Sequence, residues 1–174
     1  MNNLRITFAQ SAYISMMVFD VVFTVIGLIL FGDLFQAIIF ALLAGSIHWT
    51  GELLHNIGHS IAARYVGYPM SGIRFIGPLA ASIYPKDEGE LPPAIHIKRA
   101  LGGPLFSGLV ATVYLLMLIL TGAEGLFGVL LLFGVLGGYG IFTFGALTPL
   151  KTYFGAPFES DGDTILKYRK MLNT

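Results

Sequence analysis

Four stretches of the chain are long and apolar enough to cross a lipid bilayer as helices. A membrane-spanning helix needs about 20 predominantly apolar residues. The composition agrees, because 55% of the 174 residues are hydrophobic and only 11% are charged, whereas soluble domains carry about 25% charged residues. The sequence therefore predicts an all-α integral membrane protein with a single membrane domain over residues 1–174. Its four transmembrane helices are expected at about residues 12–31, 34–64, 100–120 and 126–147.

The lysine and arginine residues indicate how these spans are oriented. With the N-terminus in the cytoplasm, four crossings place all ten Lys and Arg on the cytoplasmic side, and the outer loops around Asp33 and Glu124 contain none. An excess of basic residues marks the cytoplasmic side of a membrane protein. We therefore expect an integral protein of a prokaryotic cytoplasmic membrane with both termini in the cytoplasm. Because ten acidic residues balance the ten basic ones, nucleic acid is not expected as a partner.

Two segments outside the spans differ from the rest of the chain. Residues 67–85 are rich in β-forming residues interrupted by Gly77-Pro78, which predicts a short inserted β-hairpin on the cytoplasmic side. This segment is too apolar for a free loop, so we expect it to lie against the helices. Residues 161–172 end in the basic stretch KYRKML, and they predict an amphipathic C-terminal helix.

The second span carries an unusual number of ionisable side chains. It is apolar to about Ile47, and then His48, Glu52, His55 and His59 follow at spacings of four, three and four residues. These spacings keep all four side chains on one face of a helix. Ionisable groups inside a bilayer are costly, and they mark functional sites. We therefore expect this face to be turned toward a partner helix or an internal cavity.

Two of these histidines are spaced to bind one metal ion. His55 and His59 are four residues apart, so both imidazoles can reach the same ion, as in the H-x-x-x-H arrangement of zinc sites. The chain has no cysteine, so no thiolate can complete the ligand set. Asp161 is the first candidate for the third ligand, with Asp163 and Glu159 as rivals.

Two of the acidic residues near this pattern have alternative roles. Asp161 lies just before the predicted C-terminal helix, where an aspartate commonly acts as the N-cap. Glu52 could be an outer ligand or could accept a hydrogen bond from a histidine N–H. Glu52 and His55 also form an E-x-x-H pair, which is half of a carboxylate-bridged di-metal site, but no second E-x-x-H pair occurs.

Three segments of the chain resemble the site-2 protease family of intramembrane zinc metalloproteases. HNIGHSIAARYVG (55–67) is similar to the H-E-x-G-H helix of that family, and RALGGPLFSG (99–108) to its G-P segment. LTPL together with PFESDGD is similar to its final P…D-G segment, in which the aspartate is the third zinc ligand. The resemblance covers roughly residues 47–166, and these segments occur in the order that the family has.

The resemblance implies a zinc site and a way of holding substrate. By this resemblance, His55, His59 and Asp161 hold one zinc ion. The hairpin would offer a strand edge to a substrate segment unwound from its helix. The remaining polar side chains of the region would lie behind the ligands or face the substrate: Glu52, His48 and Ser107.

The chain departs from the family at the position most sensitive for hydrolysis. Asn56 stands where the family has the glutamate that acts as general base, and an amide cannot take up a proton in that role. Ser107 and Ala146 stand where the family usually has asparagine. Glu52 is the only candidate for a substitute base, although it lies on the opposite side of His55 along the helix axis. No catalytic residue is therefore assigned.

The sequence leaves three functions open. The favoured one is a non-peptidase homologue that keeps the zinc site and binds or regulates another membrane protein. Its partners would be the lipid bilayer and a transmembrane helix of that protein. The second is an active intramembrane zinc protease with a non-standard base. The third is an accessory subunit of a larger respiratory or photosynthetic membrane complex, in which a histidine ligates a pigment.

Overall fold

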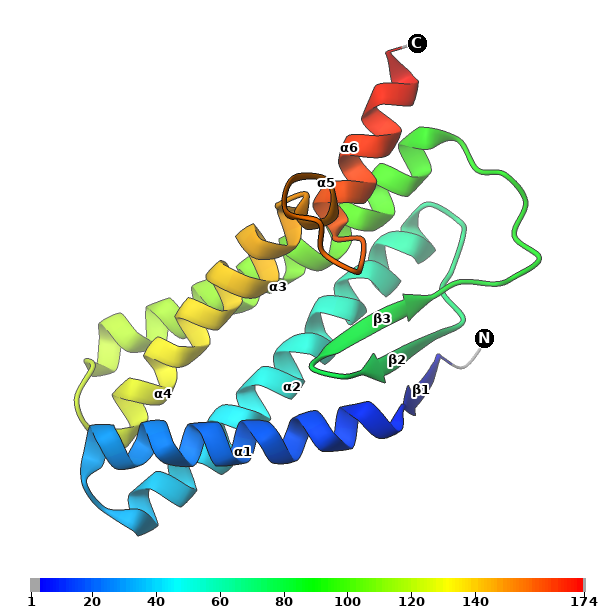
Figure 1. Ribbon diagram of the computed structural model, residues 1–174. Helices are drawn as coiled ribbons and strands as arrows, with labels where there is room; N and C mark the ends of the chain where they lie inside the picture. The colour runs from blue at the N-terminus through cyan, green and yellow to red at the C-terminus, as the bar shows by residue number, and fades with distance from the viewer. Residues whose placement is uncertain (1–3, 174) are drawn as a thin grey trace.

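Four long helices form the body of the protein in a computed structural model that describes residues 4–173 (Figure 1). Within this range, all four are long and apolar enough to cross a membrane, which confirms the prediction of a mostly helical protein with four candidate spans. The last of them begins as an α-helix and continues as a π-helix. The elements are α1 (Gln10–Phe31), α2 (Leu34–Tyr65), α3 (Pro93–Thr121), α4 (Gly125–Leu136) and η1 (Gly137–Gly145).

Helices α2 and α3 are longer than a bilayer requires. They contain 32 and 29 residues, which at 1.5 Å per residue is well over 40 Å, against a hydrocarbon core of about 30 Å. The sequence predicted a third span from about Ala100, but α3 begins at Pro93, where a proline lacking an N–H is tolerated in the first turn. The additional turns of α3 carry polar residues. They extend the helix beyond its apolar segment toward the region where the sheet and the C-terminal helix lie (Figure 1).

A three-stranded sheet packs against the helices. The predicted hairpin is formed by β2 (Gly72–Ile76) and β3 (Leu79–Ile83), which pair antiparallel, and Gly77 adopts a left-handed φ of 58° in the turn between them. The sequence did not predict the third strand, β1 (Arg5–Phe8), which pairs in parallel with β2. The sheet is held by apolar burial, because Ile73 is fully buried in a cluster with residues of α1 and α2.

Two short helices follow the last span. These are α5 (Leu150–Phe154) and α6 (Asp161–Leu172), and α6 packs along α3. Ser160 is the N-cap of α6, and its hydroxyl accepts a hydrogen bond from the Asp163 N–H at 3.2 Å. The Asp163 carboxylate accepts the Ser160 N–H at 3.1 Å in return, which completes a capping box. The cap is therefore Ser160, and Asp161 is the first residue inside the helix.

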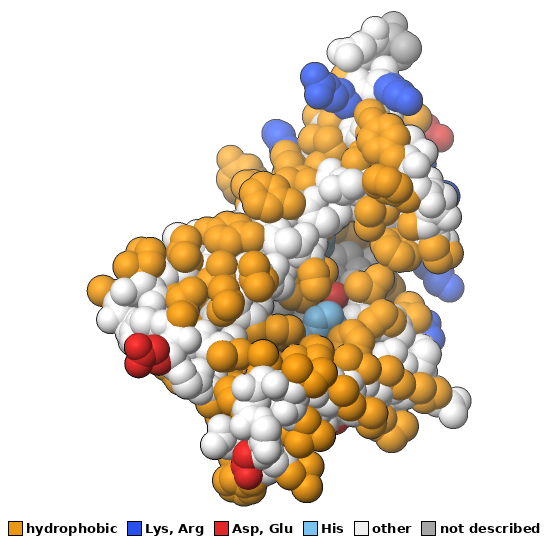
Figure 2. All heavy atoms as spheres, turned by 60° about the vertical axis from the view of Figure 1, so that its left-hand side comes forward, with side chains coloured by type: hydrophobic (Ala, Val, Ile, Leu, Met, Phe, Trp, Pro, Cys, Tyr) orange, Lys and Arg blue, Asp and Glu red, His pale blue; other side chains and the backbone are white. Residues whose placement is uncertain are grey.

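The two ends of the helix bundle differ in charge. The sheet, the C-terminal end of α2, the start of α3 and helix α6 lie toward one end, and the turns after α1 and α3 lie toward the other (Figure 1). The ten Lys and Arg lie in these elements, in α5 or, for Lys86, in the loop between β3 and α3, and Figure 2 shows basic side chains gathered around α6. This segregation agrees with the arrangement of spans inferred from the basic residues.

Helices α2 and α3 cross at a pair of glycines. A Cβ atom at Gly58 would overlap the carbonyl oxygen of Gly102 and would lie 2.6 Å from the Cβ of Phe106. A Cβ at Gly102 would in turn lie 2.5 Å from the Gly58 oxygen. The two backbones can approach this closely only because neither residue has a side chain, as at other small-residue crossings in membranes.

We predict that Gly58→Ala destabilises the protein. The added methyl group has no free space and must push α2 and α3 apart, which costs about 1–3 kcal/mol. The measurement is the thermal unfolding midpoint in detergent, with Gly137→Ala as the control. A Cβ at Gly137 meets no atom of the described chain within 4 Å. Equal midpoints for the two variants would contradict the prediction.

Candidate metal centre

The polar face of α2 is buried against the rest of the protein. His48, Glu52, His55, Asn56 and His59 are each no more than 9% exposed. They share one face because their spacings follow the helical repeat. The elements that cover them are the hairpin, α3, η1 and the start of α6. Figure 2 shows that one face of the molecule is hollowed, with histidine and acidic side chains visible inside the hollow.

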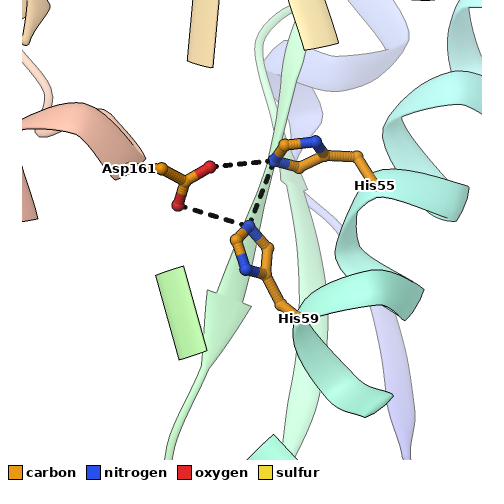
Figure 3. Close-up of side chains that lie close together, drawn as sticks. All are labelled: His55, His59 and Asp161. Atoms are coloured by element: carbon orange, nitrogen blue, oxygen red, sulfur yellow. Dashed lines mark hydrogen bonds and ion pairs between the residues drawn. The ribbon is translucent and has the colours of Figure 1, made fainter. Parts of the chain in front are cut away.

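Three of the side chains converge on one point (Figure 3). The Nε2 atoms of His55 and His59 lie 3.1 Å apart. The carboxylate of Asp161 reaches both rings, with Oδ2 at 3.2 Å from His55 Nε2 and Oδ1 at 3.3 Å from His59 Nε2. The histidines come from adjacent turns of α2, and the aspartate comes from the first turn of α6, 102 residues further along the chain than His59.

The far side of each imidazole is held by a hydrogen-bonding partner. His59 Nδ1 lies 2.8 Å from the carbonyl oxygen of Arg99. The N–H of Gly103 also lies 3.2 Å from Nδ1. When Nδ1 carries the proton, it donates to the carbonyl and a lone pair is left on Nε2. His55 Nδ1 lies 3.0 Å from the hydroxyl of Ser107. Both partners belong to α3, so this helix sets the orientation of the two rings.

The three side chains fit a metal ion. Ligand atoms on a tetrahedral zinc ion with bonds of 2.0–2.1 Å lie about 3.3–3.4 Å apart. The two Nε2 atoms lie 3.1 Å apart, and with one carboxylate oxygen of Asp161 the three ligand atoms all lie within 4.8 Å of one another. Without a cation or shared protons, two imidazole lone pairs and a carboxylate would repel one another at these distances. Among the described residues, this is the one group of His, Asp and Glu side chains found to be arranged for a metal ion.

The start of α6 holds the third side chain in place. Burial alone would raise the pKa of the Asp161 carboxyl, but the hydrogen bonds and charges of His55 and His59 hold it below its usual range. Asp163 acts as an anchor. Its carboxylate accepts hydrogen bonds from the N–H groups of Lys151 at 2.9 Å and Thr152 at 2.8 Å, and from the Thr152 hydroxyl at 2.6 Å.

The two rivals for the third ligand lie elsewhere. Burial would raise the pKa of Asp163, but the hydrogen bonds from Thr152, Lys151 and Ser160 hold it well below the usual range. Its oxygens are occupied by those donors. Glu159 forms an exposed ion pair with Lys151 at 3.0 Å. Neither residue is in the group that could hold a metal ion.

The other two ionisable residues of this face, His48 and Glu52, form hydrogen bonds with the hairpin and not with His55 or His59. His48 Nε2 lies 3.0 Å from the Pro78 carbonyl oxygen. The carboxyl group of Glu52 accepts the N–H of Ala80 at 2.7 Å. Glu52 was considered as an acceptor for a histidine N–H, but the structure gives it this strand N–H as its partner. Ser107 was expected behind the ligands or facing the substrate, and it lies directly behind His55.

Asn56 is locked between α2 and the hairpin. It is 1% exposed, and its Nδ2 donates to the carbonyl oxygens of Glu52 at 3.0 Å and Ala80 at 3.3 Å. Its Oδ1 accepts a hydrogen bond from the hydroxyl of Ser82 at 2.8 Å. Both ends of the amide are therefore satisfied by protein groups.

Gly103 was not identified from the sequence, although it shapes the site. A Cβ at this position would overlap Nε2 of His59 and would lie 2.6 Å from Nε2 of His55. The glycine therefore leaves the space that the two ligand atoms face. Gly103 is the glycine of the Gly-Pro pair in RALGGPLFSG, the segment that resembles the G-P segment, and this is the only sequence signal that could have singled it out.

One of three comparisons with known proteins finds a similar fold. Among solved structures, the chain matches "Site-2 Protease from Methanocaldococcus jannaschii" with a TM-score of 0.51 and 23% sequence identity. The chain has a site-2 protease-like fold. The match covers 92% of this chain and 65% of the solved one, so the chain spans less than two thirds of that protease. No protein-family model matches the sequence, and no curated protein matches it.

We predict that the purified protein binds about one zinc ion per chain. His59→Ala and Asp161→Ala each remove one of three ligands, so their zinc content is expected to fall below about a tenth of an equivalent. The measurement is elemental analysis after dialysis. His48→Gln is the matched control. It removes another buried imidazole of the same helix face, but this imidazole contacts the Pro78 carbonyl and not the metal site. An equal loss in His48→Gln would contradict the assignment.

Gly103→Ala is expected to abolish zinc binding without changing a ligand. The methyl group would occupy the space in front of the two Nε2 atoms and turn the rings away from each other. The control is Gly108→Ala on the same helix, where the nearest atoms of Thr143 lie at an ordinary 3.6 Å from the added Cβ. Retention of zinc by Gly103→Ala would show that this space is not needed.

Proposed function

We propose that this chain is a zinc-binding membrane protein with a site-2 protease-like fold that does not hydrolyse peptides and acts by binding or regulating another membrane protein. The observation that carries the proposal is the presence of Asn56 together with its hydrogen bonds. Asn56 occupies the position at which the resembling family has its general base, and both ends of its amide are engaged by protein groups. The zinc site thus has three ligand side chains but no group to remove a proton.

The chemistry of hydrolysis explains why this matters. Zinc bound by His55, His59 and Asp161 would supply a Lewis acid. Peptide hydrolysis also needs a base that accepts a proton from the attacking water, and general-base catalysis typically contributes about 10²–10⁴-fold. The Asn56 amide is not basic, and its oxygen already accepts the Ser82 hydroxyl. This chain's residues therefore support binding at the site better than turnover.

Glu52 does not replace the missing base. Its carboxyl group is buried and is committed to the N–H of Ala80 at 2.7 Å. It lies one turn before His55, on the side away from His59, and it is not in the group that could hold a metal ion. A base must lie within hydrogen-bond reach of the proton that it removes, and the contacts of Glu52 direct it to the hairpin.

The hairpin edge supports the same proposal. Strand β3 is an edge strand in the order β1-β2-β3, and such an edge can accept an extended segment of another chain. At Ala80, however, the N–H is bound by Glu52 and the carbonyl by Asn56. Because side chains of α2 occupy these backbone groups, a substrate strand cannot pair along the whole edge of β3.

We predict that the zinc-loaded protein does not cleave transmembrane substrates. Reconstituted protein is incubated with a panel of single-span substrates, with His55→Ala as the background and an active site-2 protease as the positive control. The expected result is the same product level for this protein and His55→Ala. Zinc-dependent cleavage that disappears in His55→Ala would contradict the proposal and would establish a base other than residue 56.

A further inference from the structure

A groove lies between α5 and α6, on the outer side of the C-terminal region. Its volume is about 520 Å³, and its lining includes Lys151, Lys167 and Lys170, with Leu166 as an apolar part of the wall. It also includes Glu159 and Asp163. None of the three metal-site residues lines the groove, so its role requires a separate explanation.

The acidic residues of the groove already have partners within the protein, but those of Asp163 are uncharged N–H and hydroxyl groups, which leave its negative charge in place. Glu159 is paired with Lys151 at 3.0 Å. The Asp163 carboxylate accepts hydrogen bonds from Lys151, Thr152 and Ser160. Lys167 and Lys170 remain, and within residues 4–173 neither of them has an ion-pair partner in the structure. Lys167 lies only over the ring of Tyr168, at 5.3 Å. The three lysines and two carboxylates of the lining give the groove a net charge of +1, and Lys167 and Lys170 are its lysines without an ion-pair partner among residues 4–173.

These two lysines lie on the same side of α6. They are three residues apart, which places neighbouring side chains on one helical face. Both are exposed, so neither has the desolvation cost that a buried ammonium group would have. Together with the wall at Leu166, they form a site with a cationic rim and an apolar part, which suits a ligand that has a negative group attached to an apolar body.

The position of the groove indicates which kind of anion it binds. Helix α5 begins five residues after the end of the last candidate span. Tyr153 and Phe154 of α5 and Phe158 in the loop after it are exposed, as expected at the boundary between lipid and water. Helix α6 packs along α3, whose 29 residues are about 13 Å longer than the hydrocarbon core. The groove is thus placed near the level of the lipid headgroups.

We propose that the groove between α5 and α6 binds the phosphate headgroup of an anionic phospholipid. Lys167 and Lys170 contact the phosphate, and Leu166 contacts the glycerol and the first part of an acyl chain. The net charge of +1 in the groove complements the single negative charge of the ligand, and the exposed aromatic residues of α5 and of the loop after it are typical of the depth where headgroups lie. The proposal does not depend on zinc binding or on the absence of peptidase activity.

The test measures lipid binding to the full chain in a neutral detergent. Phosphatidylglycerol or phosphatidylcholine is titrated in, and bound lipid is counted by native mass spectrometry. We expect the unmodified protein to bind phosphatidylglycerol in preference to phosphatidylcholine. For Lys167→Gln/Lys170→Gln, we expect binding of phosphatidylglycerol to be weaker by roughly 10- to 30-fold, the effect of removing two lysines near an anionic headgroup.

A matched control removes the same charge elsewhere. Lys86→Gln/Lys98→Gln lacks two exposed lysines at the same end of the bundle that do not line the groove, and we expect it to bind phosphatidylglycerol as the unmodified protein does. Thermal unfolding shows whether the two double variants are folded. If Lys167→Gln/Lys170→Gln does not fold, the single variant Lys170→Gln is measured in its place. We expect its binding to be about fivefold weaker.

Three results would overturn the proposal. The first is equal affinity of the unmodified protein for the two lipids. The second is equal loss of phosphatidylglycerol binding in the two double variants, which would indicate attraction by overall charge alone. The third is displacement of phosphatidylglycerol by an equal concentration of inorganic phosphate, which would indicate a site for a free anion and not for a lipid.

Discussion

The structure depends on the need to give hydrogen-bonding partners to a row of polar side chains inside an otherwise apolar helix. Water is scarce in a bilayer, so each buried polar group on α2 must find its partner within the protein. Five of them have a partner outside α2. The pairs are His48 with Pro78, Glu52 with Ala80, Asn56 with Ser82, His55 with Ser107, and His59 with Arg99. These contacts fix the hairpin and α3 on either side of α2.

The close approach of α2 and α3 follows from the same requirement. The imidazoles can reach the Arg99 carbonyl and the Ser107 hydroxyl only if the helices nearly touch. Gly58 and Gly102 permit this contact, and Gly103 leaves the space in front of the ring nitrogens. Small residues at a helix crossing and polar residues beside them therefore act together: the glycines bring the backbones close, and the hydrogen bonds orient the rings.

The third ligand side chain depends on a different set of contacts. Asp161 lies at the start of α6, and this start is held by the capping box of Ser160 and Asp163 and by the hydrogen bonds from Asp163 to α5. An acid anchored at a helix N-terminus is stabilised by the helix dipole and the free N–H groups there. The region that fixes the carboxylate is also the region that forms the basic groove. A lipid bound at α6 would therefore lie on the same helix as the carboxylate.

Much of this arrangement was predictable from local pattern. The four apolar stretches, the hairpin around Gly77-Pro78 and the C-terminal amphipathic helix follow from composition and periodicity, which depend on neighbouring residues only. The placement of His48, Glu52, His55 and His59 on one helical face follows from their spacing. The strand Arg5–Phe8 was not predictable in this way, because four residues that pair with a strand 67 positions later carry no sufficient local signal.

Local spacing is enough to place two imidazoles one turn apart on a polar face of a candidate membrane helix, because helical geometry leaves no other arrangement. Which carboxylate joins them depends on how distant segments pack. Asp161, Asp163 and Glu159 lie within five residues of one another, and the choice among them depends on the direction in which the capped start of α6 meets α2. The roles of Glu52 and Asn56 were likewise decided by the strand that packs against them, since contacts between distant segments are not encoded in local spacing.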